Sequence, residues 1–302
     1  MVQNSKKKFW WGTSRNISTN TWPSCMSKSQ PRFSEIFSPK KSLGQNFLVN
    51  PRIRHRIIEA CELEKEDVVL EIGPGKGALT AAIAAGVKEV FAVEKDDRLA
   101  EELREQFRDT NVRIIHADVL EYPLSRLPDG LKVVGNLPYN IATPIIEKVL
   151  AFRHKFPVFY MTVQLEYGDR IVAKPGSKDY GSLSCFVQYY AQAKKIFKIP
   201  PSAFRPAPRV DSCFLSLRMR PEPVHKARDE KFLFKLVRTC FNQRRKMLKN
   251  SLGVVYGKEE AEELLRKLNI DPMVRAEDLS LEDYVRLANR DGSKYPLFKS
   301  EA

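Results

Sequence analysis

Short apolar runs alternate along most of the chain with segments in which apolar residues recur every three to four positions. Runs bounded by turn-forming residues are typical of buried strands, and the periodic segments are typical of amphipathic helices. The predicted strands are DVVLEIG (67–73), EVFAVEKD (89–96), VRIIHAD (112–118), KVVGN (132–136) and VFYMTVQ (158–164). The predicted helices beside them are PRIRHRIIEACEL (51–63), GALTAAIAAG (77–86), RLAEELREQF (98–107) and PIIEKVLAF (144–152).

Strands that alternate with helices indicate an α/β fold, a doubly wound, mostly parallel, Rossmann-like sheet covered by helices on both faces. Two further stretches, SLSCFVQYYAQAKKIFKI (182–199) and DSCFLSLRM (211–219), are predicted as strands that finish the sheet in antiparallel pairing. After them the pattern changes to amphipathic helices at 231–252, 258–270 and 280–290.

The sequence pattern divides the chain into three predicted parts. They are a disordered basic extension (1–38), an α/β domain (39–220) and a small all-α domain (221–302). The extension is rich in Ser and contains a single acidic residue, Glu35, and it lacks apolar periodicity. An acid-poor, Ser-rich leader also occurs in organelle transit peptides, although this one has few Arg and no clear amphipathic helix. We expect a cytoplasmic protein, with an organelle as the alternative if the extension is a transit peptide.

The charge of the chain points to its partner. The 302 residues carry a formal net charge of +14, with 51 Lys and Arg against 37 Asp and Glu. Such an excess attracts nucleic acid or an anionic membrane surface. No apolar run approaches the roughly 18 residues of a membrane span, so the pattern favours nucleic acid and no membrane. The five Cys form no CxxC pair and the four His are dispersed, so we expect no metal site and a reducing compartment.

Three predicted strands end in residues that suit an adenosine-bearing ligand. The turn EIGPGKGALT (71–80), with Gly73 and Gly75, lets the backbone approach a ligand at the start of the next helix. Glu94, about twenty residues further on, can accept hydrogen bonds from a ribose diol, and Asp118 can accept one from an adenine amino group. Alone, each has a plainer interpretation as a turn, a surface carboxylate or a cap. Together they predict a cofactor pocket at the carboxyl edge of the sheet.

The fourth predicted strand ends in N-L-P-Y, residues 136–139. The side-chain carbonyl of Asn136 and the backbone carbonyl of Leu137 can accept the hydrogens of an exocyclic adenine amine. Two such acceptors favour a pyramidal nitrogen whose lone pair can attack a sulfonium methyl group in line. Pro138 fixes the turn, and Tyr139 offers a face on which a flipped base can stack. The plainer alternative is a strand-ending turn with a packed Tyr.

Several motifs, in this order, resemble those of the KsgA-type ribosomal RNA small-subunit adenine N6-dimethyltransferases. They are KKSLGQNFLVN (40–50), EIGPGKGALT (71–80), VEKD (93–96), HAD (116–118), GNLPYNIATPI (135–145) and IPPSAFRPAPRVDS (199–212). The resemblance implies a methyltransferase fold with a helical carboxyl-terminal domain and S-adenosylmethionine as cofactor. By that resemblance the cofactor contacts are Asn46, Leu48, Gly73, Glu94, Asp118 and Asn136.

The resemblance also implies a substrate. Members of this family dimethylate two adjacent adenosines near the 3′ end of small-subunit rRNA, so the partner would be an immature small ribosomal subunit, and we expect the enzyme to act as a monomer. Arg244, Arg245 and Lys246, within NQRRKMLKN (242–250), offer a basic face that suits RNA phosphates. The plainer interpretation of such a charge run is a solvated surface.

Two more segments have candidate roles near the pocket. Gln45 and Asn46 precede the first helix and could close over the cofactor as a lid. Phe204 lies in a Pro-stiffened loop between basic residues, where its ring could sandwich the target base opposite the tyrosine of N-L-P-Y. A core-packing Phe and an ordinary loop before a helix are the respective alternatives.

Three other functions remain open at this point. A non-catalytic relative could act as a nucleic-acid-binding or transcription accessory factor, although an intact N-L-P-Y argues against a purely binding role. A NAD-dependent dehydrogenase would share the acidic residue at the strand end, Glu94, but this function would not explain N-L-P-Y or the net charge of +14. A DNA adenine methyltransferase would share the chemistry and differ in its substrate.

Overall fold

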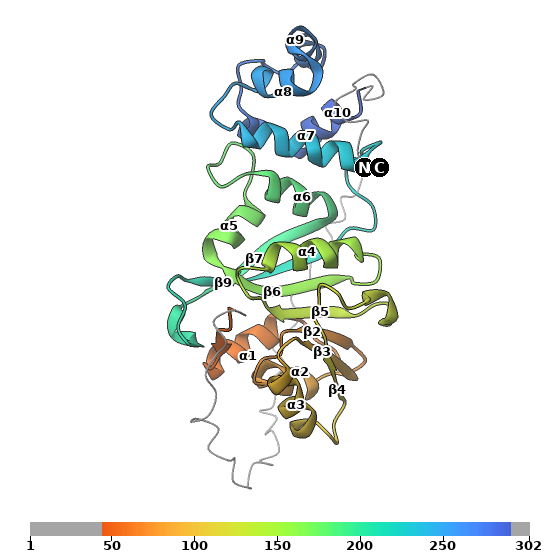
Figure 1. Ribbon diagram of the computed structural model, residues 1–302, viewed down its shortest axis with the longest axis vertical. Coiled ribbons are helices and arrows are strands. Elements are labelled where there is room, and N and C mark those ends of the chain that lie inside the picture. The colour runs from red at the N-terminus through yellow and green to blue at the C-terminus, as the bar shows by residue number, and fades with distance from the viewer. Residues whose placement is uncertain (1–43, 291–302) are drawn as a thin grey trace, which may run out of the picture. The chain divides into compact units, whose positions relative to one another are not determined.

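The computed structural model describes residues 44–290, so the predicted extension at residues 1–38 lies outside the described residues. Its central feature is a seven-stranded sheet in the order β4-β3-β2-β5-β6-β9-β7 (Figure 1). The strands are β2 (Val68–Ile72), β3 (Glu89–Glu94), β4 (Val112–His116), β5 (Lys132–Asn136), β6 (Val158–Gln164), β7 (Ala191–Ile199) and β9 (Ser212–Met219).

The sheet is doubly wound and mostly parallel, as predicted. Strands β4, β3, β2, β5 and β6 pair in parallel, and β9 pairs antiparallel with both β6 and β7. The chain adds β3 and β4 on one side of β2, and then returns to add β5 and β6 on the other side. In such sheets the ligand crevice forms outside the carboxyl ends of the strands where the direction of winding reverses, which here is between β2 and β5.

Both faces of the sheet are buried, as parallel sheets require. Side chains alternate between the two faces along a strand. In β2, Val69 belongs to a hydrophobic cluster with residues of three helices, and its neighbour Leu70 belongs to the opposite cluster. The first face is covered by α1 (Pro51–Ala60), α2 (Ala78–Ala84) and α3 (Asp97–Gln106). The second face is covered by α4 (Ala142–Ala151), α5 (Leu165–Val172) and α6 (Ser182–Tyr190).

The prediction of one strand over 182–199 is wrong for its first half. Ser182–Tyr190 form helix α6, which leads directly into strand β7. The run SLSCFVQYY is buried at Cys185, Val187 and Tyr189, so its pattern of apolar residues does not distinguish a helix from a strand. The Ser184 hydroxyl accepts a hydrogen bond from the backbone N–H of Gly181 and so caps the start of the helix.

Two other helices differ from the prediction. Helix α5 was not predicted, because its eight residues are too few to display a helical period with clarity. The single helix predicted at 231–252 is broken at residues 243–247 into α7 and α8. The four carboxyl-terminal helices are α7 (Glu230–Asn242), α8 (Leu248–Tyr256), α9 (Lys258–Lys267) and α10 (Leu281–Ala288).

The carboxyl-terminal helices share a core with one face of the sheet. Leu233 of α7 and Tyr284 of α10 belong to the same hydrophobic cluster as Val149 of α4 and Val187 of α6. Helix α7 packs directly on α6. Because buried apolar side chains of α7 and of the α4–α6 layer belong to one cluster, we expect α7 to hold a fixed position against that layer.

Candidate active site

The crevice outside the carboxyl ends of β2 and β5 holds a pocket with about 1120 Å³ of empty space, part of it open to solvent. It is lined by the carboxyl ends of β2, β3 and β5, by the Gly-rich turn after β2 and by residues 44–48. The pocket brings together ten of the residues singled out in the sequence. They are Asn46, Leu48, Gly73, Gly75, Glu94, Asp118, Asn136, Leu137, Pro138 and Tyr139.

The Gly-rich turn needs its glycines for backbone conformation and for space. Gly73 and Gly75 have φ values of 71° and 59°, in the left-handed region that L side chains rarely adopt. A Cβ atom on Gly75 would also lie 2.9 Å from the ring of Phe47, which belongs to the segment that covers the pocket. Because these two positions carry no side chain, the backbone of the turn can lie close both to the pocket and to Phe47 of the covering segment.

Glu94 holds this turn in place. Its carboxylate accepts one hydrogen bond from the backbone N–H of Gly75 (3.1 Å) and another from that of Asp96 (2.9 Å). The side chain is buried, and burial raises the pKa of the carboxyl group although the backbone N–H groups oppose the rise. Each oxygen keeps acceptor capacity beyond its one bond. A ribose diol placed in the pocket would find two acceptor oxygens already oriented.

Asp118 follows β4 at the far wall of the pocket. One oxygen accepts from the backbone N–H of Leu120 (2.9 Å), and the other accepts from the ammonium group of Lys95 (2.6 Å). Partial burial raises the pKa of this carboxyl group, but the bonds from Lys95 and Leu120 outweigh it, so the pKa lies below its ordinary value. Asp118 therefore presents an ionised acceptor at the pocket.

Asn136, at the end of β5, has a defined orientation. Its side-chain nitrogen donates a hydrogen bond to the backbone carbonyl of Asn46 (2.8 Å). A carbonyl oxygen only accepts, so the amide nitrogen must face Asn46 and the side-chain oxygen must face away from it. The bond ties the covering segment to β5 and fixes the acceptor of the N-L-P-Y motif beside the pocket.

Tyr139 is held by a residue that the sequence did not reveal. Its hydroxyl lies 2.6 Å from the hydroxyl of Ser212, which is fully buried at the start of β9. Burial also raises the pKa of the Tyr139 phenol, so the group stays neutral at physiological pH. The edge of the ring is thus anchored to the antiparallel part of the sheet while the residue lines the pocket.

Glu71 is a second pocket residue that sequence reasoning missed. It lies inside β2, it is 1% exposed, and its Oε2 atom has no hydrogen-bond partner within residues 44–290. Burial, with the charge of nearby Glu94, raises the pKa of the Glu71 carboxyl group to about 8. The available signal was a carboxylate inside the otherwise apolar run VVLEI.

The segment predicted to act as a lid lines the pocket at residues 44–48. The side-chain nitrogen of Gln45 donates to Asp96 (3.3 Å), and the short strand β1 (Phe47–Leu48) pairs antiparallel with β8 (Phe204–Arg205). This pairing places Phe204 in the core, where it is 1% exposed. Its ring is therefore not available to sandwich a base in this arrangement, and the core-packing alternative is the one the structure favours.

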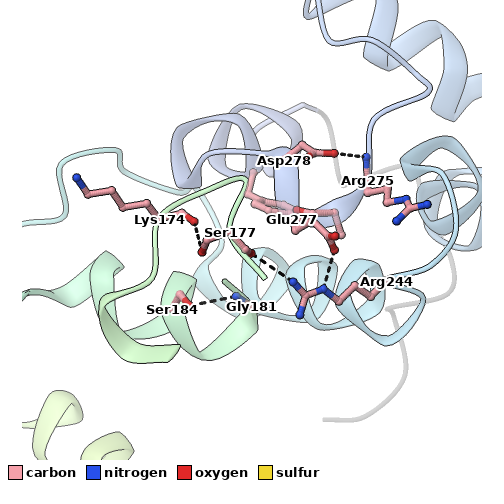
Figure 2. A network of polar contacts seen from close by, with 10 residues as sticks. Lys174, Ser177, Gly181, Ser184, Arg244, Arg275, Glu277 and Asp278 are labelled. Carbon is pink, nitrogen blue, oxygen red and sulfur yellow. Dashed lines mark hydrogen bonds and ion pairs between the residues drawn. The ribbon is translucent and has the colours of Figure 1, made fainter. Parts of the chain in front are cut away.

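The three basic residues predicted to bind RNA have different surroundings. Arg244 donates to the carboxylate of Glu277 (2.6 Å) and to the backbone carbonyl of Ser177 (3.3 Å), and so links the turn after α7 to the loop between α5 and α6 (Figure 2). Arg245 and Lys246 are exposed. Only the latter two side chains are therefore placed to meet a phosphate without breaking a contact within the protein.

The described residues add two observations about other site types. No helix within residues 44–290 is long and apolar enough to cross a membrane. In the same part of the chain, no group of three or more His, Cys, Asp or Glu side chains is placed to hold a metal ion.

The doubly wound sheet, the Gly-rich turn after β2 and the acid that ends β3 suit an adenosine-bearing cofactor, and the N-L-P-Y residues in the same pocket indicate the class of S-adenosylmethionine-dependent methyltransferases. The family model "Ribosomal RNA adenine dimethylase" matches residues 36–291. The chain is 43% identical over 261 residues to ribosomal RNA small subunit methyltransferase A of Halothermothrix orenii, covering 82% of this chain and 87% of that one. It is 42% identical to the protein of the same name from Anoxybacillus flavithermus, covering 88% and 94%.

Solved structures agree with this assignment. A dimethyladenosine transferase from Plasmodium falciparum superposes with a TM-score of 0.69 at 25% identity, covering 80% of this chain and 95% of that one. The 23S rRNA methyltransferase ErmE superposes with a TM-score of 0.65 at 28% identity, covering 81% and 99%. The chain belongs to the ribosomal RNA adenine dimethylase family, whose cofactor is S-adenosylmethionine.

Proposed function

We propose that this protein uses S-adenosylmethionine to dimethylate the N6 atoms of two adjacent adenosines near the 3′ end of small-subunit rRNA. The observation that carries the proposal is the orientation of Asn136. The side-chain nitrogen of Asn136 donates a hydrogen bond to Asn46, so the side-chain oxygen is held as an acceptor beside the cofactor pocket. An acceptor held in this way suits an amine substrate.

The pocket residues fit the cofactor. Glu94 would hold the ribose and Asp118 the adenine, since both carboxylates line the pocket and keep acceptor capacity. The Gly-rich turn, with its backbone bare at Gly73 and Gly75, leaves room for the methionine part. When bound, S-adenosylmethionine supplies a methyl group activated by its positively charged sulfur.

The N-L-P-Y residues would act on the substrate base. The Asn136 side-chain oxygen and the Leu137 backbone carbonyl would accept the two amine hydrogens and turn the nitrogen lone pair toward the methyl group. Tyr139, fixed at its hydroxyl by Ser212, would stack on the flipped adenine. These groups position and polarise, so the transfer needs no strong base.

The substrate assignment draws on charge and on the named relatives. The net charge of +14 suits a polyanion, and exposed Arg245 and Lys246 on the turn between α7 and α8 are placed to meet RNA phosphates. We propose an immature small ribosomal subunit as the partner and a monomer as the active form. The proposed location is the cytoplasm, where such a substrate would be found. The alternative is an organelle with its own ribosomes, if residues 1–38 act as a transit peptide.

The direct test is to incubate the protein with unmodified small subunits and labelled S-adenosylmethionine and then to map the methylated bases. The proposal expects dimethyladenosine at two adjacent positions near the 3′ end of the rRNA. Duplex DNA rich in adenine serves as the competing substrate and should take up no label. Label in DNA only, or no label at all, would contradict the proposal.

A further inference from the structure

A second groove lies between α4, α5, α6 and α7, separate from the cofactor pocket. It holds about 660 Å³ of empty space, part of it open to solvent. We name it the α4–α7 groove. The residues that line it and carry the argument are Thr143, Tyr167, Arg170, Phe186, Phe234 and Arg238.

Helix α4 separates the groove from the cofactor pocket. Ile141 and Ile145, at the start of α4, line the pocket, whereas Thr143 and Glu147 line the groove. Residues two apart on a helix point about 200° apart, so the two cavities lie on opposite sides of the same helical turns. A helix with its side chains is about 10–12 Å across. The groove is therefore separated by about one helix diameter from the pocket that Tyr139 lines, a span that a few nucleotides of RNA can cover.

The groove combines aromatic rings with cationic side chains. Phe186 and Phe234 meet edge to face with ring centroids 5.0 Å apart, and the Tyr167 hydroxyl lies 2.9 Å from that of Thr143. Arg170 and Arg238 are both exposed at the groove. The acidic residue among the lining side chains is Glu147, and its carboxylate is 3.5 Å from the guanidinium of Arg238.

We propose that the α4–α7 groove binds a nucleotide of single-stranded RNA that flanks the target adenosine. Its base would lie against the rings of Tyr167, Phe186 and Phe234, and its phosphates would meet Arg170 and Arg238. Aromatic faces bind bases of any kind, and guanidinium groups bind phosphate, so this combination is typical of single-strand RNA sites. An apolar protein segment fits less well, because it would bury Arg170 and Arg238 with Glu147 as the single carboxylate among the lining residues. The proposal rests on the proposed function, since it assumes an RNA target at Tyr139.

The first test is a salt titration of binding to a short single-stranded RNA with two adjacent adenosines. We expect Arg170→Gln and Arg238→Gln each to reduce the slope of log affinity against log salt by about 0.7, the value for one phosphate contact on a single strand. Arg104→Gln is the matched control, because Arg104 is an exposed arginine on α3, outside the groove. Glu147→Gln breaks the same ion pair as Arg238→Gln but should leave RNA binding intact or tighter.

The second test places a photoreactive 5-iodouridine beside the adenosines and maps the crosslinked peptide. Crosslinks to Tyr167, Phe186 or Phe234 support the groove. Crosslinks confined to other segments would overturn the proposal, as would slopes for both groove variants equal to that of the Arg104 control. Failure of the proposed function is distinguishable, because wild-type protein would then leave small subunits without dimethyladenosine whatever the groove binds.

Discussion

The cofactor crevice and the turn between α7 and α8 both carry polar side chains with a predicted role, but they hold them differently. In the crevice, Glu94 and Asn136 are fixed by hydrogen bonds to backbone groups of other segments. On the turn, Arg245 and Lys246 are exposed. Polar groups that are fixed before the substrate arrives need no reorganisation when charge develops in the transition state. Exposed cations act mainly through their electrostatic field, which salt screens. We therefore expect the crevice residues to act in the chemical step and the turn residues to act in attracting RNA.

The largest expected effect is on the rate of methylation, when a fixed group of the crevice is removed. Asn136→Ala should reduce the single-turnover rate of methylation on small subunits by about a hundredfold or more, because loss of one positioned acceptor typically costs that much. Tyr139→Ala should also be severe, and Tyr139→Phe milder, because stacking needs the ring. The phenylalanine variant still loses the bond to Ser212, so some loss of rate is expected.

Glu94→Ala should come next. Removing the carboxylate takes away the ribose acceptor and the bond that holds Gly75, so S-adenosylmethionine affinity should fall by roughly 1–3 kcal/mol, the scale of hydrogen bonds to a charged group. Calorimetry measures the change directly. Glu94→Gln, which keeps one acceptor oxygen, should lie between the alanine variant and wild type. Unchanged affinity in both variants would refute the ribose assignment.

Much of this account follows from sequence because strand ends in a parallel sheet converge. Glu94 and Asn136 are 42 residues apart in the chain, yet both line one pocket. They do so because they end β3 and β5, the two strands that flank β2. The five parallel strands were predictable from apolar runs between turn signals. The alternation of these strands with helices predicted a doubly wound sheet, and the structure supplies the order of the strands.

What could not be predicted depended on burial and on long-range pairing. The helix formed by SLSCFVQYY is buried on several sides, so its apolar residues do not show the periodicity from which a helix is predicted. Phe204 is a core residue because β8 pairs with β1, a contact between segments far apart in the chain. Arg244 belongs to an internal contact for the same reason, since Glu277 is its partner.

The basic turn offers a prediction of intermediate size. Arg245→Ala with Lys246→Ala should reduce the slope of log RNA affinity against log salt by about 0.7–0.9 per lost phosphate contact. Cofactor affinity should be unchanged. Arg244→Gln provides the contrast, because it should lower the free energy of unfolding by about 1 kcal/mol through the lost bonds to Glu277 and Ser177. If the variants of Arg244, Arg245 and Lys246 gave the same result in RNA binding and in unfolding, the distinction between Arg244 as an internal contact and the other two as RNA-binding residues would be wrong.

The last prediction before the closing test concerns pH and the free energy of unfolding rather than methyl transfer. The pKa of Glu71 is raised from the usual 4.5 to about 8, so the folded protein keeps a proton that the unfolded chain has lost. The free energy of unfolding should therefore decline as pH rises from about 4.5 to about 8 and then level off. The raised pKa of Glu94 acts in the same direction. Urea unfolding of Glu71→Gln should show a flatter decline, and an unchanged profile would mean that Glu71 is ionised in the folded protein.

One kinetic comparison tests the division between chemistry and attraction most directly. Single-turnover methylation is measured over a range of small-subunit concentrations for wild type, for Asn136→Ala and for the Arg245→Ala, Lys246→Ala double variant. The account predicts that Asn136→Ala stays about a hundredfold or more slower at saturating subunits. It predicts that the double variant reaches the wild-type rate once subunits saturate it. A near-normal saturated rate for Asn136→Ala would contradict the catalytic role of the N-L-P-Y motif.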